Sequence, residues 1–308
     1  MTDTARPSAS GPYRGRFAPT PSGPLHLGSL LAALASYLDA RHHGGQWLLR
    51  IDDLDRPRCP PGADQRILRQ LEAHGLDWDD TPHYQSRHLD DYHHCLVALQ
   101  NTGQIYACDC TRATLACESH SGTDGPVYSG RCRERRLAAD GRALRRRIGF
   151  GSVVLDDDIQ GPQQRDLQAD IGDIVVRRRD GIIGYQLASS VDDHLMRISD
   201  VVRGADLTGS SATQHELISG LGWTPPRYRH VPLLTDADGL KLSKQNHAPA
   251  IEDDQAAANL WRCLTWLAQQ PPTELRAAAP REQLAWAIPN WRRARVAAAA
   301  QQSMTLTA

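Results

Sequence analysis

Two short stretches of the chain carry residue types that could bind phosphate. The first, FAPTPSGPLHLGSL (Phe17–Leu30), combines prolines that stiffen the backbone with Gly23 and Gly28, where a ligand could approach it closely. His26 lies where a helix is predicted to begin, and Ser29 is the predicted N-cap. Because the first turn of a helix has unpaired N–H groups and a partial positive charge, the stretch predicts an anion site. The alternative is a capped helix with an exposed histidine.

The second stretch is KLSKQ (Lys241–Gln245), which follows a strand-like run. Its two lysines, Lys241 and Lys244, could neutralise a triphosphate and stabilise charge that develops as a phosphate bond breaks. The usual phosphate motifs GxxxxGK[ST] and GxGxxG are absent from the sequence. A solvated surface loop is the alternative for the lysines taken alone.

A group of cysteines suggests a metal site. Cys108, Cys110, Cys117 and Cys132 fall within 25 residues of one another. In a reducing compartment this spacing favours zinc over disulfides, and a structural zinc needs four ligands. From the residues alone the fourth ligand is open between Cys117, His120 and Tyr128, and packed free cysteines are the alternative to any metal.

The elements that must position these residues alternate in type along the first hundred positions. The pattern predicts a helix through Leu27–Leu38, a strand at Gln46–Asp53, and helices at about Asp64–His74 and Arg87–Gln100. Such alternation favours an α/β fold with a parallel sheet. Later segments predict a hairpin around Asp180-Gly181 within Asp173–Ala188, a helix at about Thr213–Gly220, and Ala-rich helices near the C-terminus.

Composition limits the class of protein and its partners. The 308 residues carry 35 basic and 36 acidic side chains, so the net charge gives no support for nucleic-acid binding. Only Arg131–Arg147, with eight arginines, is a local candidate for RNA contact, and a solvated helix face is the alternative. No apolar run approaches the roughly 20 residues of a membrane span, and the N-terminus is not a secretory signal. We expect a cytoplasmic monomer without a membrane partner.

The motifs, taken in order, resemble a known family. PLHLGS and KLSK look like the HIGH and KMSKS signatures of class I aminoacyl-tRNA synthetases. Five segments between Arg16 and Ile251 together resemble the glutamyl and glutaminyl branch: RFAPTPSGPLHLGSL, RIDDLDRPR, YQS, VVRGADL and GLKLSKQNHAPA. The cysteines, and an end of the chain soon after KLSK, resemble the glutamyl-Q tRNA(Asp) synthetase family. Such proteins look like the catalytic half of a glutamyl-tRNA synthetase.

The resemblance implies a domain organisation. It implies a Rossmann-type catalytic domain at 13–250. The 12 residues before it are polar and rich in proline and serine, which predicts a flexible leader at 1–12. A zinc-containing, acceptor-type insertion at 105–190 would interrupt that domain. The remaining 251–308 would be helical, without an anticodon-binding domain.

The resemblance also implies an activity. Family members activate L-glutamate with ATP and Mg²⁺, without needing tRNA, and transfer glutamate to queuosine at the wobble position of tRNA(Asp). The alternatives are a glutamyl- or glutaminyl-tRNA synthetase-like enzyme that charges a tRNA 3′ end, and a non-catalytic RNA-binding paralogue. An unrelated nucleotidyltransferase would leave the glutamate-pocket residues without a role.

Site residues follow from the matching positions. In this resemblance the glutamate pocket comprises Arg16, Phe17, Ala18, Pro19, Thr20, Asp52, Tyr185 and Arg203. Two arginines can hold the two carboxylates of glutamate, Asp52 its ammonium, and Tyr185 can donate a hydroxyl. ATP would be bound by His26, Gly28, Ser29 and Lys244, and the catalytic groups would be His26, Lys241 and Lys244.

The sequence departs from the family pattern at two of these positions. Asp52 stands where the family commonly has glutamate, so its carboxylate reaches one methylene less far and could act through water or share the role with Asp53. Ser29 replaces the second histidine of HIGH, and its hydroxyl can still donate to a phosphate oxygen. The family metal pattern C-x-C…Y-x-x-x-C matches Cys108, Cys110, Tyr128 and Cys132 and implies one structural zinc.

Overall fold

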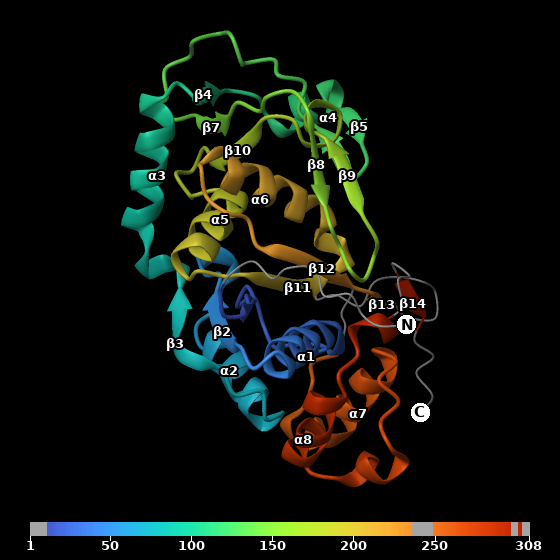
Figure 1. The fold of residues 1–308 in the computed structure, drawn as a ribbon. Coiled ribbons are helices and arrows are strands. Elements are labelled where there is room, and N and C mark those ends of the chain that lie inside the picture. Colours follow the sequence, from blue (N-terminus) through green and yellow to red (C-terminus); the bar gives the residue numbers. More distant parts are fainter. Residues whose placement is uncertain (1–10, 236–248, 297–300, 304–308) are drawn as a thin grey trace.

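A parallel sheet forms the centre of the molecule. The computed structural model describes residues 11–235, 249–296 and 301–303 (Figure 1). Strands β1 (Arg14–Phe17), β2 (Gln46–Ile51) and β3 (Asp79–Tyr84) pair in parallel, as do β11 (Asp200–Gly204) and β12 (Arg227–Val231). The N–H of Ser199 donates to the carbonyl of Arg14 at 3.0 Å, which joins the two groups of strands beside β1. The α/β prediction is therefore confirmed.

The predicted helices are present with small shifts at their ends. They are α1 (Leu27–His42), α2 (Ala63–Ala73), α3 (Leu89–Asn101) and α6 (Thr208–Gly220). The N-cap prediction for α1 was wrong by three residues. His26 is the N-cap, with its side chain accepting from the Ser29 N–H, while the Ser29 hydroxyl accepts from the His26 N–H. An imidazole nitrogen thus performs the capping that a hydroxyl was expected to perform.

An antiparallel region lies between α3 and α5 (Tyr185–Leu195), at the top of Figure 1. Its strands β4 (Ile105–Cys108), β7 (Ala143–Arg146) and β10 (Ile174–Arg177) form one sheet. Two hairpins, β5 (His120–Gly122) with β6 (Gly125–Val127) and β8 (Ser152–Leu155) with β9 (Gln163–Asp166), and helix α4 (Arg112–Glu118) complete it.

The predicted hairpin at Asp180-Gly181 was half right. The turn exists, with Gly181 at φ +87° and the Arg178 N–H donating to the Ile182 carbonyl at 2.8 Å. However, only one bridge, Arg177 to Ile183, follows it before the chain enters α5. Leu187, Ala188 and Val191 have helical spacing and are buried, so the second run packs as a helix.

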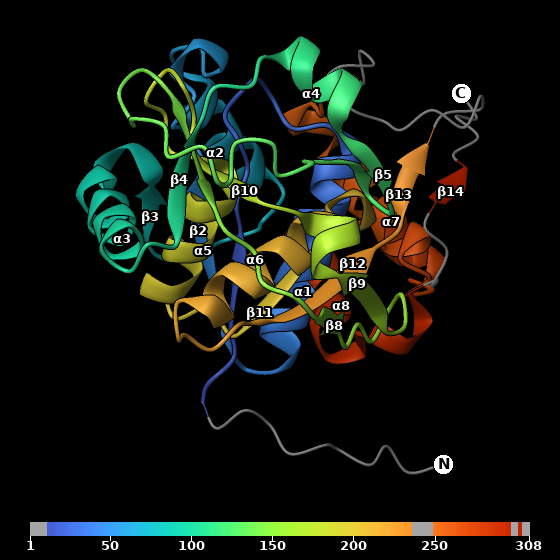
Figure 2. The same cartoon turned by 90° about the horizontal axis from the view of Figure 1, so that it is seen from above.

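The C-terminal helices α7 (Ala256–Trp266) and α8 (Pro280–Asn290) pack on α1 (Figure 1). Buried Asp39 of α1 links these layers, because its carboxylate accepts from the Tyr13 hydroxyl, the Trp291 indole and Arg293. Strand β13 (Leu233–Thr235) pairs in parallel with β14 (Gln301–Ser303). Viewed from above, α3 lies on the opposite flank from β13 and β14 (Figure 2). Among the described residues no helix is long and apolar enough to cross a membrane.

Candidate active site

A cavity of about 380 Å³ lies at the carboxyl ends of β1, β11 and β12. Ligands of open parallel sheets bind at such ends. The first turn of α1 and the start of α5 form other parts of its wall. Ten of the sequence-predicted residues line it: Arg16, Phe17, Ala18, Pro19, Thr20, His26, Gly28, Ser29, Tyr185 and Arg203. The structure therefore brings together segments that are up to 187 positions apart in the chain, although it does not test the role of each residue.

The first turn of α1 faces this cavity. His26, Gly28 and Ser29 all line it, and the capping box fixes the entry of the chain into the helix. Backbone pairing ties the same turn to a distant segment, since Ala250 bridges to His26 and the Ile251 N–H donates to the Leu25 carbonyl at 2.9 Å. A helix N-terminus held in this way is suited to a phosphate group.

Two buried arginines line the cavity. Arg16 and Arg203 are only 4% and 5% exposed, so each guanidinium is largely removed from water. Burial lowers the pKa of Arg203, and the nearby charge of Arg16 adds to that shift. Its hydrogen bonds within the described structure go to the Ser211 hydroxyl, and its Nη1 atom is buried without a partner there. A buried cation without a carboxylate favours an anionic ligand.

Asp52 lies next to the cavity but is not part of its lining. Its N–H donates to the carbonyl of Pro19, whereas its carboxylate accepts from Arg50 at 2.7 Å. Arg50 also contacts Asp193 at 2.7 Å and Asp192 at 3.6 Å. Three carboxylates around one fully buried arginine leave an excess of negative charge here. The cluster could attract an ammonium group, and the role of Asp52 itself stays a prediction.

Lys241 and Lys244 lie outside the described residues. The chain on both sides of that segment lies at the cavity, because Leu233 and Leu234 line it and Ala250 pairs with His26. The expectation that Lys244 shares a nucleotide with His26 is compatible with these two ends and is otherwise untested.

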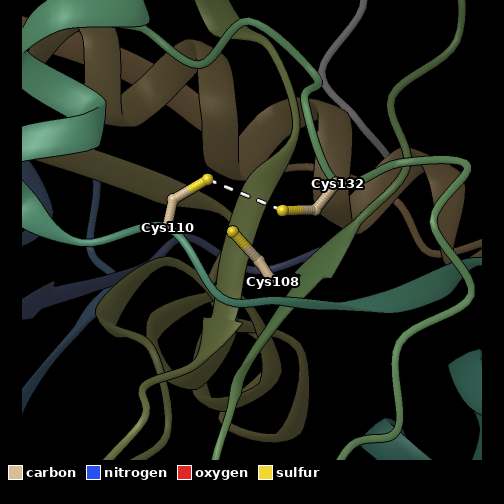
Figure 3. A group of neighbouring side chains, drawn as sticks. All are labelled: Cys108, Cys110 and Cys132. Carbon is tan, nitrogen blue, oxygen red and sulfur yellow. Dashed lines mark hydrogen bonds between the residues drawn. The ribbon is translucent and has the colours of Figure 1, made fainter.

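Three cysteines converge at the end of β4 in the antiparallel region (Figure 3). The Sγ atoms of Cys108, Cys110 and Cys132 lie within 4.8 Å of one another, and those of Cys110 and Cys132 are 3.6 Å apart. The Tyr128 hydroxyl lies 3.6 Å from the sulfur of Cys108 and 3.7 Å from that of Cys110. A tetrahedral zinc with one oxygen and three sulfur ligands would require about 3.8 Å between sulfurs and about 3.5 Å between sulfur and oxygen. These four side chains therefore fit a metal ion.

The electrostatics around this group also suit bound metal. Although burial opposes it, hydrogen bonds from Tyr128 and Arg145 lower the pKa of the Cys108 thiol. Burial raises the pKa of Cys110 to about 11, so this thiol needs a cation to become a ligand. The other candidates for a fourth ligand lie elsewhere: Cys117 is exposed, and exposed His120 contacts the Ala169 carbonyl.

The arginine run from 131 to 147 is not a helix face, so that alternative was wrong. Arg145 and Arg146 lie buried in β7, and Arg146 pairs with Glu216. The other described ion pairs of the run join Arg131 to Glu118, Arg133 to Asp173, Arg135 to Asp109 and Arg147 to Glu134. Acidic side chains of the same molecule thus neutralise much of the positive charge of the run, and RNA contact stays a prediction.

Sequence reasoning missed several residues near the cavity. Asp193 contacts both Arg16 and Arg50, and Ser211 holds Arg203. The motif RID could have revealed Arg50. Residues two positions apart on a strand share a face, so Arg50 and Asp52 could have been expected to pair as they do. The partners of Arg203 had no such signal, since they come from separate elements.

Comparisons with known proteins identify the family of the chain. The sequence model described as tRNA synthetases class I (E and Q), catalytic domain, matches residues 13–261. The chain is 47% identical to glutamyl-Q tRNA(Asp) synthetase from Chromobacterium violaceum, covering 93% of this chain and 96% of the relative. It is 49% identical to the protein of that name from Thiobacillus denitrificans, covering 90% and 92%.

A solved structure has the same fold. This is a glutamate tRNA ligase from Elizabethkingia meningosepticum in complex with its amino acid, with a TM-score of 0.78 and 24% identity over 96% of this chain and 67% of that one. The chain therefore belongs to the glutamyl-Q tRNA(Asp) synthetase family, within the class I tRNA synthetases of the E and Q type.

Proposed function

We propose that this protein activates L-glutamate with ATP, without needing tRNA, and transfers the glutamyl group to queuosine at the wobble position of tRNA(Asp). One observation carries the proposal: Arg203 lines the cavity beside Arg16, is buried, and has no carboxylate partner among the described residues. The name of the relatives, glutamyl-Q tRNA(Asp) synthetase, supports queuosine of tRNA(Asp) as the acceptor of the glutamyl group.

Glutamate fits the charges around the cavity. Arg16 and Arg203 would hold a carboxylate through paired N–H groups. The acidic cluster of Arg50, Asp52, Asp192 and Asp193 would favour the ammonium end. Tyr185, which is 42% exposed at the start of α5, would donate its hydroxyl from the rim of the cavity. Glutamine, with a neutral amide in place of the second carboxylate, would leave a buried cation unpaired.

The first reaction step joins glutamate to AMP. A carboxylate oxygen attacks the α-phosphorus of ATP, the bond from that phosphorus to the bridging oxygen breaks, and pyrophosphate leaves with the electron pair. The first turn of α1, with His26, Gly28 and Ser29, would stabilise the phosphates. Lys244 would neutralise charge at the α-phosphate with Lys241 assisting, and Mg²⁺ would enter with ATP.

The second step releases AMP. A nucleophilic group of queuosine attacks the acyl carbon and loses its proton to solvent, the bond from the acyl carbon to the phosphate oxygen breaks, and AMP leaves with the electron pair. Cys108, Cys110, Tyr128 and Cys132 would hold one zinc ion that cross-links the antiparallel region. The metal would serve the fold of that region.

Isotope exchange tests the first step. Protein with zinc bound should catalyse glutamate-dependent exchange of pyrophosphate into ATP with no tRNA present, and glutamine should not replace glutamate. Absence of exchange in folded, zinc-loaded protein would overturn the proposal.

Mass spectrometry tests the second step. After reaction with tRNA(Asp) that contains queuosine, nuclease digestion should yield glutamate on the queuosine nucleoside. The same tRNA with guanosine at the wobble position is the control and should remain unmodified. Glutamate on the terminal adenosine would instead show a synthetase that charges the 3′ end.

A further inference from the structure

A line of buried hydrogen bonds extends from Arg203 into the protein. Arg203 lies on β11, Ser211 on α6, His230 on β12, and Asp157 in the loop between β8 and β9. The β8–β9 hairpin extends along α6 towards β12 (Figure 1), and at its tip the Gln160 amide donates to the His230 carbonyl at 2.9 Å. None of the four side chains is more than 5% exposed.

The distances define three contacts in series. Arg203 donates to the Ser211 hydroxyl oxygen from Nε at 3.0 Å and from Nη2 at 2.5 Å. That hydroxyl lies 2.5 Å from Nε2 of His230, and Nδ1 of His230 lies 2.6 Å from the Asp157 carboxylate. The second Asp157 oxygen accepts the N–H groups of Ile159 and Gln160, which fixes the carboxylate in its own turn.

The partners of His230 determine its tautomer. The Asp157 carboxylate can only accept, so Nδ1 of His230 carries the proton that it donates at 2.6 Å. Nε2 of the neutral imidazole then accepts from the Ser211 hydroxyl at 2.5 Å, and the Leu207 carbonyl, 3.1 Å away, is a second acceptor for the same hydroxyl. Burial lowers the pKa of His230 and the charge of Arg203 acts in the same direction, against the opposing carboxylate of Asp157.

We propose that Asp157, His230 and Ser211 form a positioning relay that orients Arg203 for the carboxylate of glutamate. The relay binds one edge of the guanidinium, so that Nη1, which is buried and has no partner among the described residues, remains available for a ligand in the cavity. The relay rests on the proposed function, because it assigns part of the affinity of that same site for glutamate to Asp157, His230 and Ser211.

The order serine, histidine, aspartate is also that of a hydrolase triad, but the geometry excludes this role. Ser211 and His230 are fully buried and do not line the cavity, so no substrate carbonyl can reach the hydroxyl. The relay residues act through Arg203 and are positioning residues.

Two conservative substitutions test the relay, each with a matched control. Ser211→Ala removes the acceptor of Arg203, and Ser36→Ala removes an equally buried serine hydroxyl that contacts Ala33 and Trp47. In Asp157→Asn the amide oxygen can still accept from the N–H groups of Ile159 and Gln160, but the NH₂ group that then faces His230 cannot accept from Nδ1–H. The control Asp166→Asn alters a similar turn, where Asp166 accepts the N–H groups of Gln168 and Ala169.

The readout is the KM for glutamate, compared with the KM for ATP, in pyrophosphate exchange. We expect Ser211→Ala to raise the KM for glutamate about 30-fold and Asp157→Asn about 5-fold, while the KM for ATP changes less than about 2-fold, as expected for lost charged hydrogen bonds. Both controls should leave the two KM values near those of wild type. Equal changes in the two KM values, or a glutamate KM that matches the controls, would overturn the relay.

NMR of the imidazole nitrogens gives a second readout that does not depend on activity. Wild-type His230 should carry its proton on Nδ1, and Asp157→Asn should move it to Nε2. A wild-type Nε2–H tautomer would overturn the relay even if Ser211→Ala did not fold. If wild type shows no glutamate-dependent exchange, the proposed function fails and the relay fails with it. Normal exchange with an unchanged glutamate KM in both variants would overturn the relay alone.

Discussion

Two buried arginines near the cavity have opposite surroundings. Arg50 contacts the carboxylates of Asp52, Asp192 and Asp193, which raise its pKa well above the usual value although burial opposes them. Arg203 contacts a hydroxyl, and burial lowers its pKa. The protein itself neutralises the first charge and leaves the second to a ligand. Burial of a charge therefore indicates binding only where its counter-charge is missing.

Matched methionine substitutions would test this contrast, and the largest effect should come from Arg203→Met. The change keeps volume but removes the cation, so glutamate-dependent exchange should fall at least about 1,000-fold in kcat/KM, or about 4 kcal/mol. The free energy of unfolding, measured with urea, should stay unchanged or rise, because an uncompensated buried charge is lost. A large loss of stability would contradict the contrast.

Arg50→Met should have the opposite effect on stability. It removes the cation that Asp52, Asp192 and Asp193 share and leaves Asp193 with Arg16 and Asp192 with His83. We expect the free energy of unfolding to fall by about 3–5 kcal/mol. Urea unfolding followed by circular dichroism measures this loss. A fully stable Arg50→Met protein would show that the cluster does not stabilise the fold.

The cysteine group extends the comparison to a cluster whose counter-charge, in our proposal, is a zinc ion. Cys132→Ser should reduce bound zinc, measured by mass spectrometry, from about one ion per chain to near zero. Because a bound metal would close a loop between Cys108 and Cys132, we expect a loss of about 3 kcal/mol in unfolding free energy. Cys117→Ser is the control, since exposed Cys117 lies outside the group. Equal zinc content in both variants would contradict the assigned ligands.

The smallest effect concerns pH. Burial opposes the shift, but the hydrogen bond from His83 and the charge of Arg50 lower the pKa of Asp192 below 3.8. A lowered carboxyl pKa gives stability that is present above 3.8 and is lost as the pH falls through the folded-state value. Asp192→Asn should therefore be about 2 kcal/mol less stable than wild type at pH 7, and the difference should shrink below pH 4. A difference that grows in acid would contradict this sign.

Local pattern predicted much of the fold. Apolar spacing placed α2 within one residue at each end and identified the start of α1, because both helices bury apolar side chains in the core. It failed at the second run of the Asp180-Gly181 hairpin. In that run, residues that favour strands also have helical spacing. The chain forms helix α5 there, with Leu187 and Val191 buried.

The candidate site was predictable where motifs carry it. Arg16–Thr20, His26, Tyr185 and Arg203 all line one cavity, and their roles stay predictions. Asp52 was expected to line it too, but its carboxylate faces Arg50. A motif identifies the residue type at a position but not the side chains that this residue contacts in the folded protein.

The α/β alternation, the cysteine spacing and the candidate anion site at the first turn of α1 could be predicted from the sequence, because these depend on residues close along the chain. Which buried charges are neutralised depends on contacts that form in the folded chain. Asp157, Ser211 and His230 come from three elements and have no local signature, so their contact with Arg203 exists only after the β8–β9 hairpin has packed against α6 and β12. Electrostatic energy depends on distance in space, which the order of residues does not fix.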